Sequence, residues 1–149
     1  MKIWIDADSC PTRIREIIIR ASNREKIEAV FVANRELPLL YGNFVRFVLV
    51  PEGSEEADKY ITEQAAPDDI VITRDIPFAS LLVEKGIIVL NDRGTLYTVE
   101  NMGERLSIRN FMKGLRERNL YSSRESEFGK KEVENFANTF DRELRKKLQ

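Results

Sequence analysis

The sequence KIWIDADSCP at residues 2–11 begins as a short apolar segment typical of a β-strand and then changes to two aspartates and a proline. A second stretch, IVITRDIP at residues 70–77, has the same order: an apolar strand pattern, an aspartate, and a proline that opens a helix. Proline suits the first turn of a helix because its missing N–H would have no partner there. Each stretch therefore predicts a strand followed by a helix, with carboxylates at the junction.

Strand and helix patterns alternate around these two stretches. Apolar runs that predict strands buried on both faces occupy 29–33, 45–50 and 87–90. One-sided helices are expected to begin near Pro11, after Ser54 as N-cap, and at Pro77. Residues 95–98 favour a hairpin strand at the sheet edge. This alternation is typical of an α/β protein in which helices cover both faces of a mostly parallel sheet.

The last third of the chain has no strand pattern. Two helices are expected there, at about 100–118 and 130–147, joined by a polar link at 122–126 that is expected to be disordered. A length of 149 residues fits one domain. We therefore expect a single three-layer domain over residues 1–149, with a C-terminal helical extension at about 100–149.

Composition excludes several kinds of chemistry. The chain has no His, which excludes a Ser-His-Asp triad, a Cys-His pair and a His-ligated zinc. Its single Cys excludes an intramolecular disulfide, a Cys-x-x-Cys pair and a four-Cys metal site. The groups left for catalysis are carboxylates, amines, guanidiniums, hydroxyls and metals bound through oxygen.

Charge is unevenly distributed. Residues 1–100 carry 12 Lys and Arg against 17 Asp and Glu, whereas residues 101–149 carry 12 against 8. This asymmetry suggests an acidic pocket beside a basic surface. No stretch approaches the ~20 apolar residues of a membrane span, and no signal-peptide pattern is present, so a cytoplasmic protein without membrane association is expected.

The carboxylates at the two strand ends are expected to meet. Ligand crevices of such sheets lie outside the carboxyl ends of the strands. If the two strands are neighbours, Asp6, Asp8 and Asp75 converge, and Asp58 joins them from the first turn of its helix. Clustered carboxylates repel one another unless a cation neutralises them. Mg²⁺ or Mn²⁺ binds through oxygen ligands alone and supports phosphoryl chemistry.

A simpler interpretation remains open for each of these acids. An aspartate before a proline-initiated helix also fits a plain N-cap, and Asp58 also fits a solvated helix face. Two acids as close as Asp6 and Asp8 exceed what capping requires. Cys10 fits a small buried residue, and Trp4 fits the core.

A basic stripe is predicted on the helix from about residue 100. Its members are spaced by four, four and three residues: Arg105, Arg109, Lys113 and Arg116. An apolar face of Ile108, Phe111, Met112 and Leu115, expected to pack on the sheet, lies roughly 100° away. The stripe would then lie beside the cleft and bind phosphates of RNA. Simple solvation of an exposed helix face explains the same charges.

Longer motifs in the chain resemble those of the YaiI/YqxD family of bacterial proteins, a family of uncharacterised function. They are IDADSCP at 5–11, EADKYI at 56–61, ITRDIP at 72–77 and NDRGTLYT at 91–98. The pairs and triplets at 105–106, 109–112 and 136–138 also fit, so the resemblance covers nearly the whole chain.

This resemblance implies a PIN-like fold, similar to a superfamily of metal-dependent nucleases. Those nucleases place one acid after the first strand, one on a mid-chain helix, and one after a strand that ends in Thr-x-Asp. Asp6 or Asp8, then Asp58, then Asp75 follow that order here. Beyond Asp75, no further acid is evident for this pattern other than Asp92, which is assigned to a turn.

Three hypotheses follow. The first is a Mg²⁺- or Mn²⁺-dependent nuclease acting on RNA, with the four aspartates as catalytic metal ligands and the basic stripe steering the strand. The second is a non-catalytic module that binds nucleic acid or a partner through the same cleft. The third is a phosphatase resembling the haloacid dehalogenase group, with Asp6 as nucleophile and Asp8 as acid, although the lysine and later acidic pair of that group are not evident.

Overall fold

The computed structural model describes residues 1–53, 55–117 and 128–149, so Ser54 and the link at 122–126 lie outside the described residues. Its centre is a six-stranded sheet with strand order β3-β2-β1-β4-β5-β6. The strands are β1 (Lys2–Asp6), β2 (Glu28–Ala33), β3 (Val45–Leu49), β4 (Ile70–Ile72), β5 (Ile88–Leu90) and β6 (Leu96–Tyr97). The first five are parallel, and β6 pairs antiparallel to β5 as the predicted hairpin strand.

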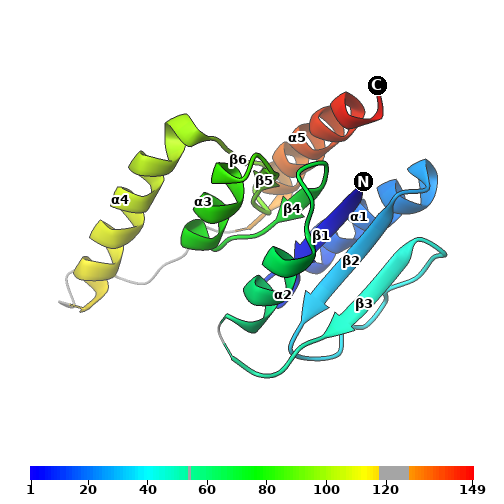
Figure 1. Cartoon of the computed structure of the whole chain (residues 1–149), viewed down its shortest axis with the longest axis horizontal. Coiled ribbons are helices and arrows are strands. Elements are labelled where there is room, and N and C mark those ends of the chain that lie inside the picture. The colour runs from blue at the N-terminus through cyan, green and yellow to red at the C-terminus, as the bar shows by residue number, and fades with distance from the viewer. Residues whose placement is uncertain (54, 118–127) are drawn as a thin grey trace.

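Helices cover both faces of this sheet (Figure 1). They are α1 (Thr12–Glu25), α2 (Glu56–Gln64), α3 (Ile76–Glu84), α4 (Val99–Glu117) and α5 (Lys130–Leu148). Helices α1 and α5 pack on one face, and α2 and α3 pack on the other. The predicted three-layer α/β architecture is therefore confirmed. In the described part of the chain, every helix is too short or too polar to span a membrane.

The two-residue period of the strands divides the apolar side chains between two cores. Ile3 and Ile5 of β1 face α1 and α5, where Phe136 and Phe140 stack with ring centroids 5.3 Å apart. Trp4, between them in sequence, faces α2 and α3. Both faces of β1 are thus buried, as expected for the central strand of a parallel sheet.

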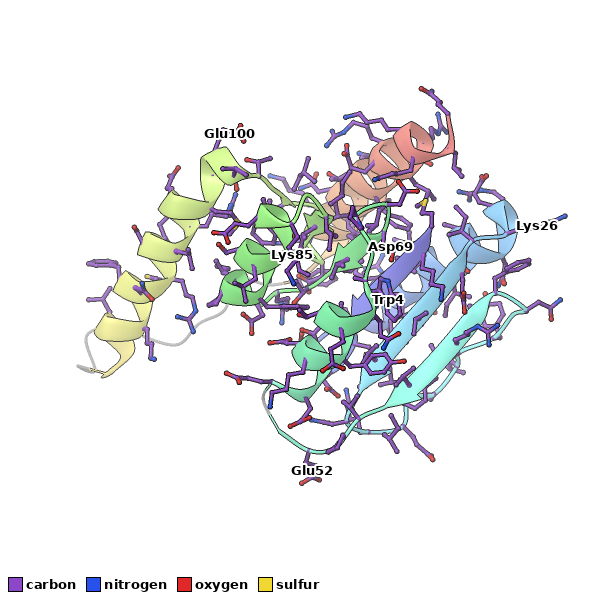
Figure 2. All side chains as sticks on the ribbon, viewed as in Figure 1. Trp4, Lys26, Glu52, Asp69, Lys85 and Glu100 are labelled. Atoms are coloured by element: carbon purple, nitrogen blue, oxygen red, sulfur yellow. The ribbon has the colours of Figure 1, made fainter. Side chains whose placement is uncertain are left out.

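A buried carboxylate fixes the pairing of β1 with β4. Asp69, directly before β4, accepts hydrogen bonds from the backbone N–H of Lys2 at 2.8 Å and from the indole Nε1 of Trp4 at 2.9 Å. It also accepts one from the N–H of Ala66 at 2.8 Å. Figure 2 shows Trp4 and Asp69 side by side. These hydrogen bonds stabilise the register in which Ile3 pairs with Ile70.

A glycine lets α5 approach the turn between β5 and β6. Gly94 has a φ of +84°, and a Cβ at that position would lie 2.4 Å from the carbonyl oxygen of Asn135. The hydroxyl of Thr139 donates to the Gly94 carbonyl at 2.8 Å. Because only glycine fits this close approach, the turn residue positions the C-terminal helix against the sheet.

Two expectations about exposure were wrong. Strand β3 is the edge of the sheet and is only partly covered, with Leu49 58% exposed, because within the described residues it has a neighbouring strand, β2, on one side alone. Helix α4 packs on α3 instead of on the sheet (Figure 1), through Met102. The apolar face predicted to be buried is open to solvent at Ile108 (53% exposed) and Phe111 (65%).

Replacing Asp69 with Ala should lower the free energy of unfolding by about 2–4 kcal/mol, because three N–H groups, including the buried indole of Trp4, lose their acceptor. Urea denaturation measures this change. The neighbouring Asp68→Ala is the matched control, since the Asp68 side chain is 85% exposed, and it should change the free energy by less than about 0.5 kcal/mol. Equal effects of the two variants would contradict the claim that the hydrogen bonds of Asp69 stabilise the fold.

Candidate functional site

The site lies where the chain reverses its direction across the sheet. From β1 the chain runs to β2 and β3 on one side, then crosses back to β4 and β5 on the other. Ligand crevices in parallel α/β sheets form at such a switch point, outside the carboxyl ends of the strands. Ile5 pairs with Ile72, so Asp6 at the end of β1 lies beside Thr73 at the end of β4. The predicted adjacency of the two acidic strand ends is confirmed.

A chain of hydrogen bonds joins Asp6 to the start of α3. The buried hydroxyl of Thr73 donates to Oδ2 of Asp6 at 2.9 Å and accepts from the backbone N–H of Asp75 at 3.1 Å. Burial raises the pKa of Asp6, and the negative charges of Asp75 and Asp8 raise it further, whereas the Thr73 hydrogen bond lowers it. Asp6 is therefore held in place at an electrostatic cost.

Asp75 is both a helix cap and a member of the acidic cluster. Its Oδ1 accepts a hydrogen bond from the N–H of Phe78 at 3.0 Å, as an N-cap does. The simpler capping interpretation is thus correct for Asp75. Its carboxylate also lies beside that of Asp58, so capping does not account for its whole environment.

The pKa of Asp58 reflects both its burial and the carboxylates around it. Burial, the charges of Asp75 and Asp6, and a hydrogen bond to Asp75 together raise its pKa to about 7, with burial as the largest cause. The protonated form of Asp58 donates that hydrogen bond. The sequence prediction that Asp58 joins the strand-end acids from the first turn of α2 is consistent with this arrangement.

Asp8 has a different set of partners. Its two carboxylate oxygens accept from the backbone N–H of Asn34, at 3.2 and 3.1 Å, beyond the end of β2. The guanidinium of Arg35 lies 3.9 Å from Oδ1. Asp8 is close enough to raise the pKa of Asp6, but its hydrogen bonds hold the loop after β2.

Asp92 lies in a turn, as predicted, but the sequence analysis did not place it beside Asp6. This residue follows β5, is only 2% exposed, and forms an ion pair in which Arg74 Nε lies 2.9 Å from its Oδ2. Burial raises the pKa of Asp92, and the adjacent Arg74 lowers it. Together with Asp6 and Cys10, it lines a small cavity. The signal that could have placed it there is the same as for Asp75, an acid shortly after a parallel strand. Cys10 is buried as predicted, and burial raises the pKa of its thiol to about 12.

An open cleft of about 460 Å³ borders the acidic cluster. Asp58 and Asp75 line it together with apolar side chains of α3, among them Leu81, and Arg109 reaches it from α4. Glu55, Lys59, Thr62 and Glu63 complete the α2 side. The cleft therefore offers carboxylates, one guanidinium and an apolar wall to a ligand.

Two other members of the basic stripe, Arg105 and Lys113, do not line this cleft. The guanidinium of Arg105 lies over the ring of Tyr97, 5.8 Å from its centroid, and its buried Nε makes no hydrogen bond within the described residues. Lys113 is exposed on α4. The side chain of Arg116 lies outside the described part of the chain. The prediction of a basic row beside the acids thus reduces, in the described chain, to Arg109.

The chemistry of the donor set fits a hard divalent cation. Asp6, Asp58 and Asp75 supply only oxygen, and their mutual repulsion is what a bound cation would relieve. Within residues 1–53, 55–117 and 128–149, however, no three His, Cys, Asp or Glu side chains are already arranged around one ion position.

Comparison with known proteins gives one consistent result. The model of a family described as "Uncharacterized BCR, YaiI/YqxD family" matches residues 4–146. A UPF0178 protein of Syntrophobacter fumaroxidans is 49% identical over 99% of this chain and 97% of its own length. Those of Treponema denticola and Myxococcus xanthus are 49% and 47% identical, over 99% and 97% of this chain and 94% of their own lengths. No solved structure matches.

Replacing Asp58 with Asn should stabilise the protein at pH 8 by on the order of 1 kcal/mol and by clearly less at pH 5. The pKa of Asp58 is raised from 3.8 to about 7 in the folded protein. As pH rises through this interval, the unfolded chain loses the proton first, so the free energy of unfolding falls. An Asn amide donates to Asp75 at every pH and removes this loss.

Thermal unfolding in a metal chelator at the two pH values measures the effect. Asp68→Asn makes the same change of charge on an exposed side chain and serves as the control. Stabilisation by Asp58→Asn of equal size at pH 5 and pH 8 would show that Asp58 does not titrate within this interval.

Proposed function

The chain belongs to the YaiI/YqxD family, and we propose that it is a divalent-metal-dependent nuclease that cleaves RNA at the acidic cleft. The observation that carries the proposal is the convergence of Asp6, Asp58 and Asp75 at the switch point, where burial and mutual repulsion raise the pKa of Asp58 to about 7. A carboxyl group whose pKa is raised this far by burial and by neighbouring carboxylates is typical of a functional site.

Mg²⁺ or Mn²⁺ is the cofactor that these ligands favour. Asp6, Asp58 and Asp75 would hold it, with Asp8 contributing from beside Asp6. A divalent ion bound in such a site activates a water molecule and stabilises the charge that develops on a phosphate. No imidazole or reactive thiol is available for the same task, since the chain has no His and the pKa of Cys10 is about 12.

The chain's own residues orient the reacting groups. Thr73 fixes the Asp6 carboxylate by the 2.9 Å hydrogen bond, and the N–H of Phe78 fixes one oxygen of Asp75. Arg109 lines the cleft, where it would neutralise a backbone phosphate of the RNA. The apolar wall at Leu81, which is 56% exposed, offers a surface for a base. RNA in this cleft would therefore lie between α2, α3 and α4.

The phosphatase hypothesis is weaker on the same geometry. It requires Asp6 as a free nucleophilic carboxylate. The Oδ2 atom of Asp6 already accepts a hydrogen bond from Thr73, which makes that oxygen a weaker nucleophile. Metal-dependent hydrolysis by water does not require Asp6 to attack phosphorus.

Replacing Asp75 with Asn should abolish Mn²⁺-dependent cleavage of a labelled single-stranded RNA, with a loss of at least about 10²-fold in rate. The Asn side chain remains a good N-cap for Phe78, so the fold is expected to persist, and circular dichroism checks it. Asp68→Asn, which removes a charge from an exposed side chain, should cleave at the parent rate.

The outcomes separate the hypotheses. Cleavage by the parent that survives in Asp75→Asn would contradict the assignment of this cleft as the active site. RNA binding by the parent with no cleavage in Mg²⁺ or Mn²⁺ would favour the non-catalytic binding module instead.

A further inference from the structure

The outer edge of β3 is an unpaired strand in the described structure. It lies at the border of the sheet, away from α4 and α5 (Figure 1). The N–H of Ala29 donates to the Phe44 carbonyl, and the N–H of Val50 donates to the Ala33 carbonyl. Residues 44 and 50 thus direct their backbone groups to β2, and by alternation residues 45, 47 and 49 direct theirs outward. Of these outward groups, the N–H of Val45 already donates to the carbonyl of Gly42 at 3.4 Å.

This edge lacks the features that normally protect an exposed strand. Residues 45–49 read VRFVL, without proline or glycine and with one charge. That charge, Arg46, forms an ion pair with Glu28 on the neighbouring strand. The edge is therefore largely apolar and its one charge is paired, which makes it a template for another strand.

Exposed apolar side chains gather beside the same edge. Phe47 is 36% and Leu49 58% exposed, and both are on the α1 face of the sheet with Val45. The preceding loop adds Leu39, 72% exposed, and Tyr41, 55% exposed. This surface therefore combines the outward backbone groups of Phe47 and Leu49 with exposed apolar side chains, a combination found in protein interfaces.

We propose that β3 pairs antiparallel with β3 of a second copy of this chain, about a two-fold axis at Phe47. In this register Phe47 lies opposite Phe47 of the other copy, and Val45 lies opposite Leu49. The outward N–H and C=O of Phe47 bond to their counterparts, and the N–H of Leu49 meets the carbonyl of Val45. Arg46 lies opposite Val48, so no like charges face each other.

Self-complementarity is the reason to choose a second copy as the occupant. Val45, Phe47 and Leu49 each meet an apolar residue under the two-fold operation, and the only charge, Arg46, meets the neutral Val48. The pairing would join two sheets into one of twelve strands. Because the paired strands are antiparallel, the two acidic clefts would open at opposite edges, so dimerisation does not depend on the proposed nuclease activity.

Sedimentation velocity of the full chain across a wide concentration series tests this pairing. The parent should be a dimer that dissociates on dilution. Phe47→Glu places two like charges across the axis and should raise the dimer dissociation constant on the order of a hundredfold. Phe111→Glu introduces the same charge on the exposed face of α4 and should leave the dimer intact.

A charge-swap experiment makes the test specific to this register. Phe47→Glu and Phe47→Lys should each be monomeric alone and should form a heterodimer when mixed, which also shows that both variants are folded. A parent that is monomeric at every concentration would overturn the proposal. So would a dimer that persists in Phe47→Glu or that Phe111→Glu disrupts, or two monomeric variants that do not associate on mixing.

Discussion

The parallel pairing of β1 with β4 is the constraint on which the rest of the structure depends. Asp69 fixes it by binding the N–H of Lys2 and the indole of Trp4, at the end of the strands remote from the site. Once the register is set there, Asp6 and Thr73 are adjacent at the opposite end. A one-residue slip would move Asp6 away from Thr73 and turn the apolar side chains to the wrong core. Fold and candidate site therefore share one structural cause.

The acidic cluster is kept together against its own repulsion. The two cores, one on each face of the sheet, hold β1, α2 and α3 in fixed relation, and this packing brings Asp58 close to Asp75 and Asp6. A raised pKa means that ionising Asp58 costs free energy in the folded protein. We interpret that cost as stability that is lost for the sake of the proposed cation site.

Much of this was predictable from the sequence, and the exceptions have physical reasons. Asp6 and Asp75 could be placed because acids that follow parallel strands share one edge of the sheet. The orientation of Asp8 could not, since it depends on the backbone of Asn34, 26 residues away in the chain. Periodicity shows that α4 has an apolar face but not whether a partner covers it, so the exposure of Phe111 was missed. The length and hydrophobicity of a strand likewise do not reveal that β3 is an edge.

Titration of Mn²⁺ into the chelator-treated protein, followed by calorimetry, tests the central claim most directly. The claim is that the carboxylates at the ends of β1 and β4 and on α2 form one cation site. Saturable binding is expected in the parent, and it should be lost in Asp6→Asn while Asp68→Asn keeps it. No binding in the parent, or an unchanged isotherm in Asp6→Asn, would contradict the claim and leave the strand-end acids as structural groups.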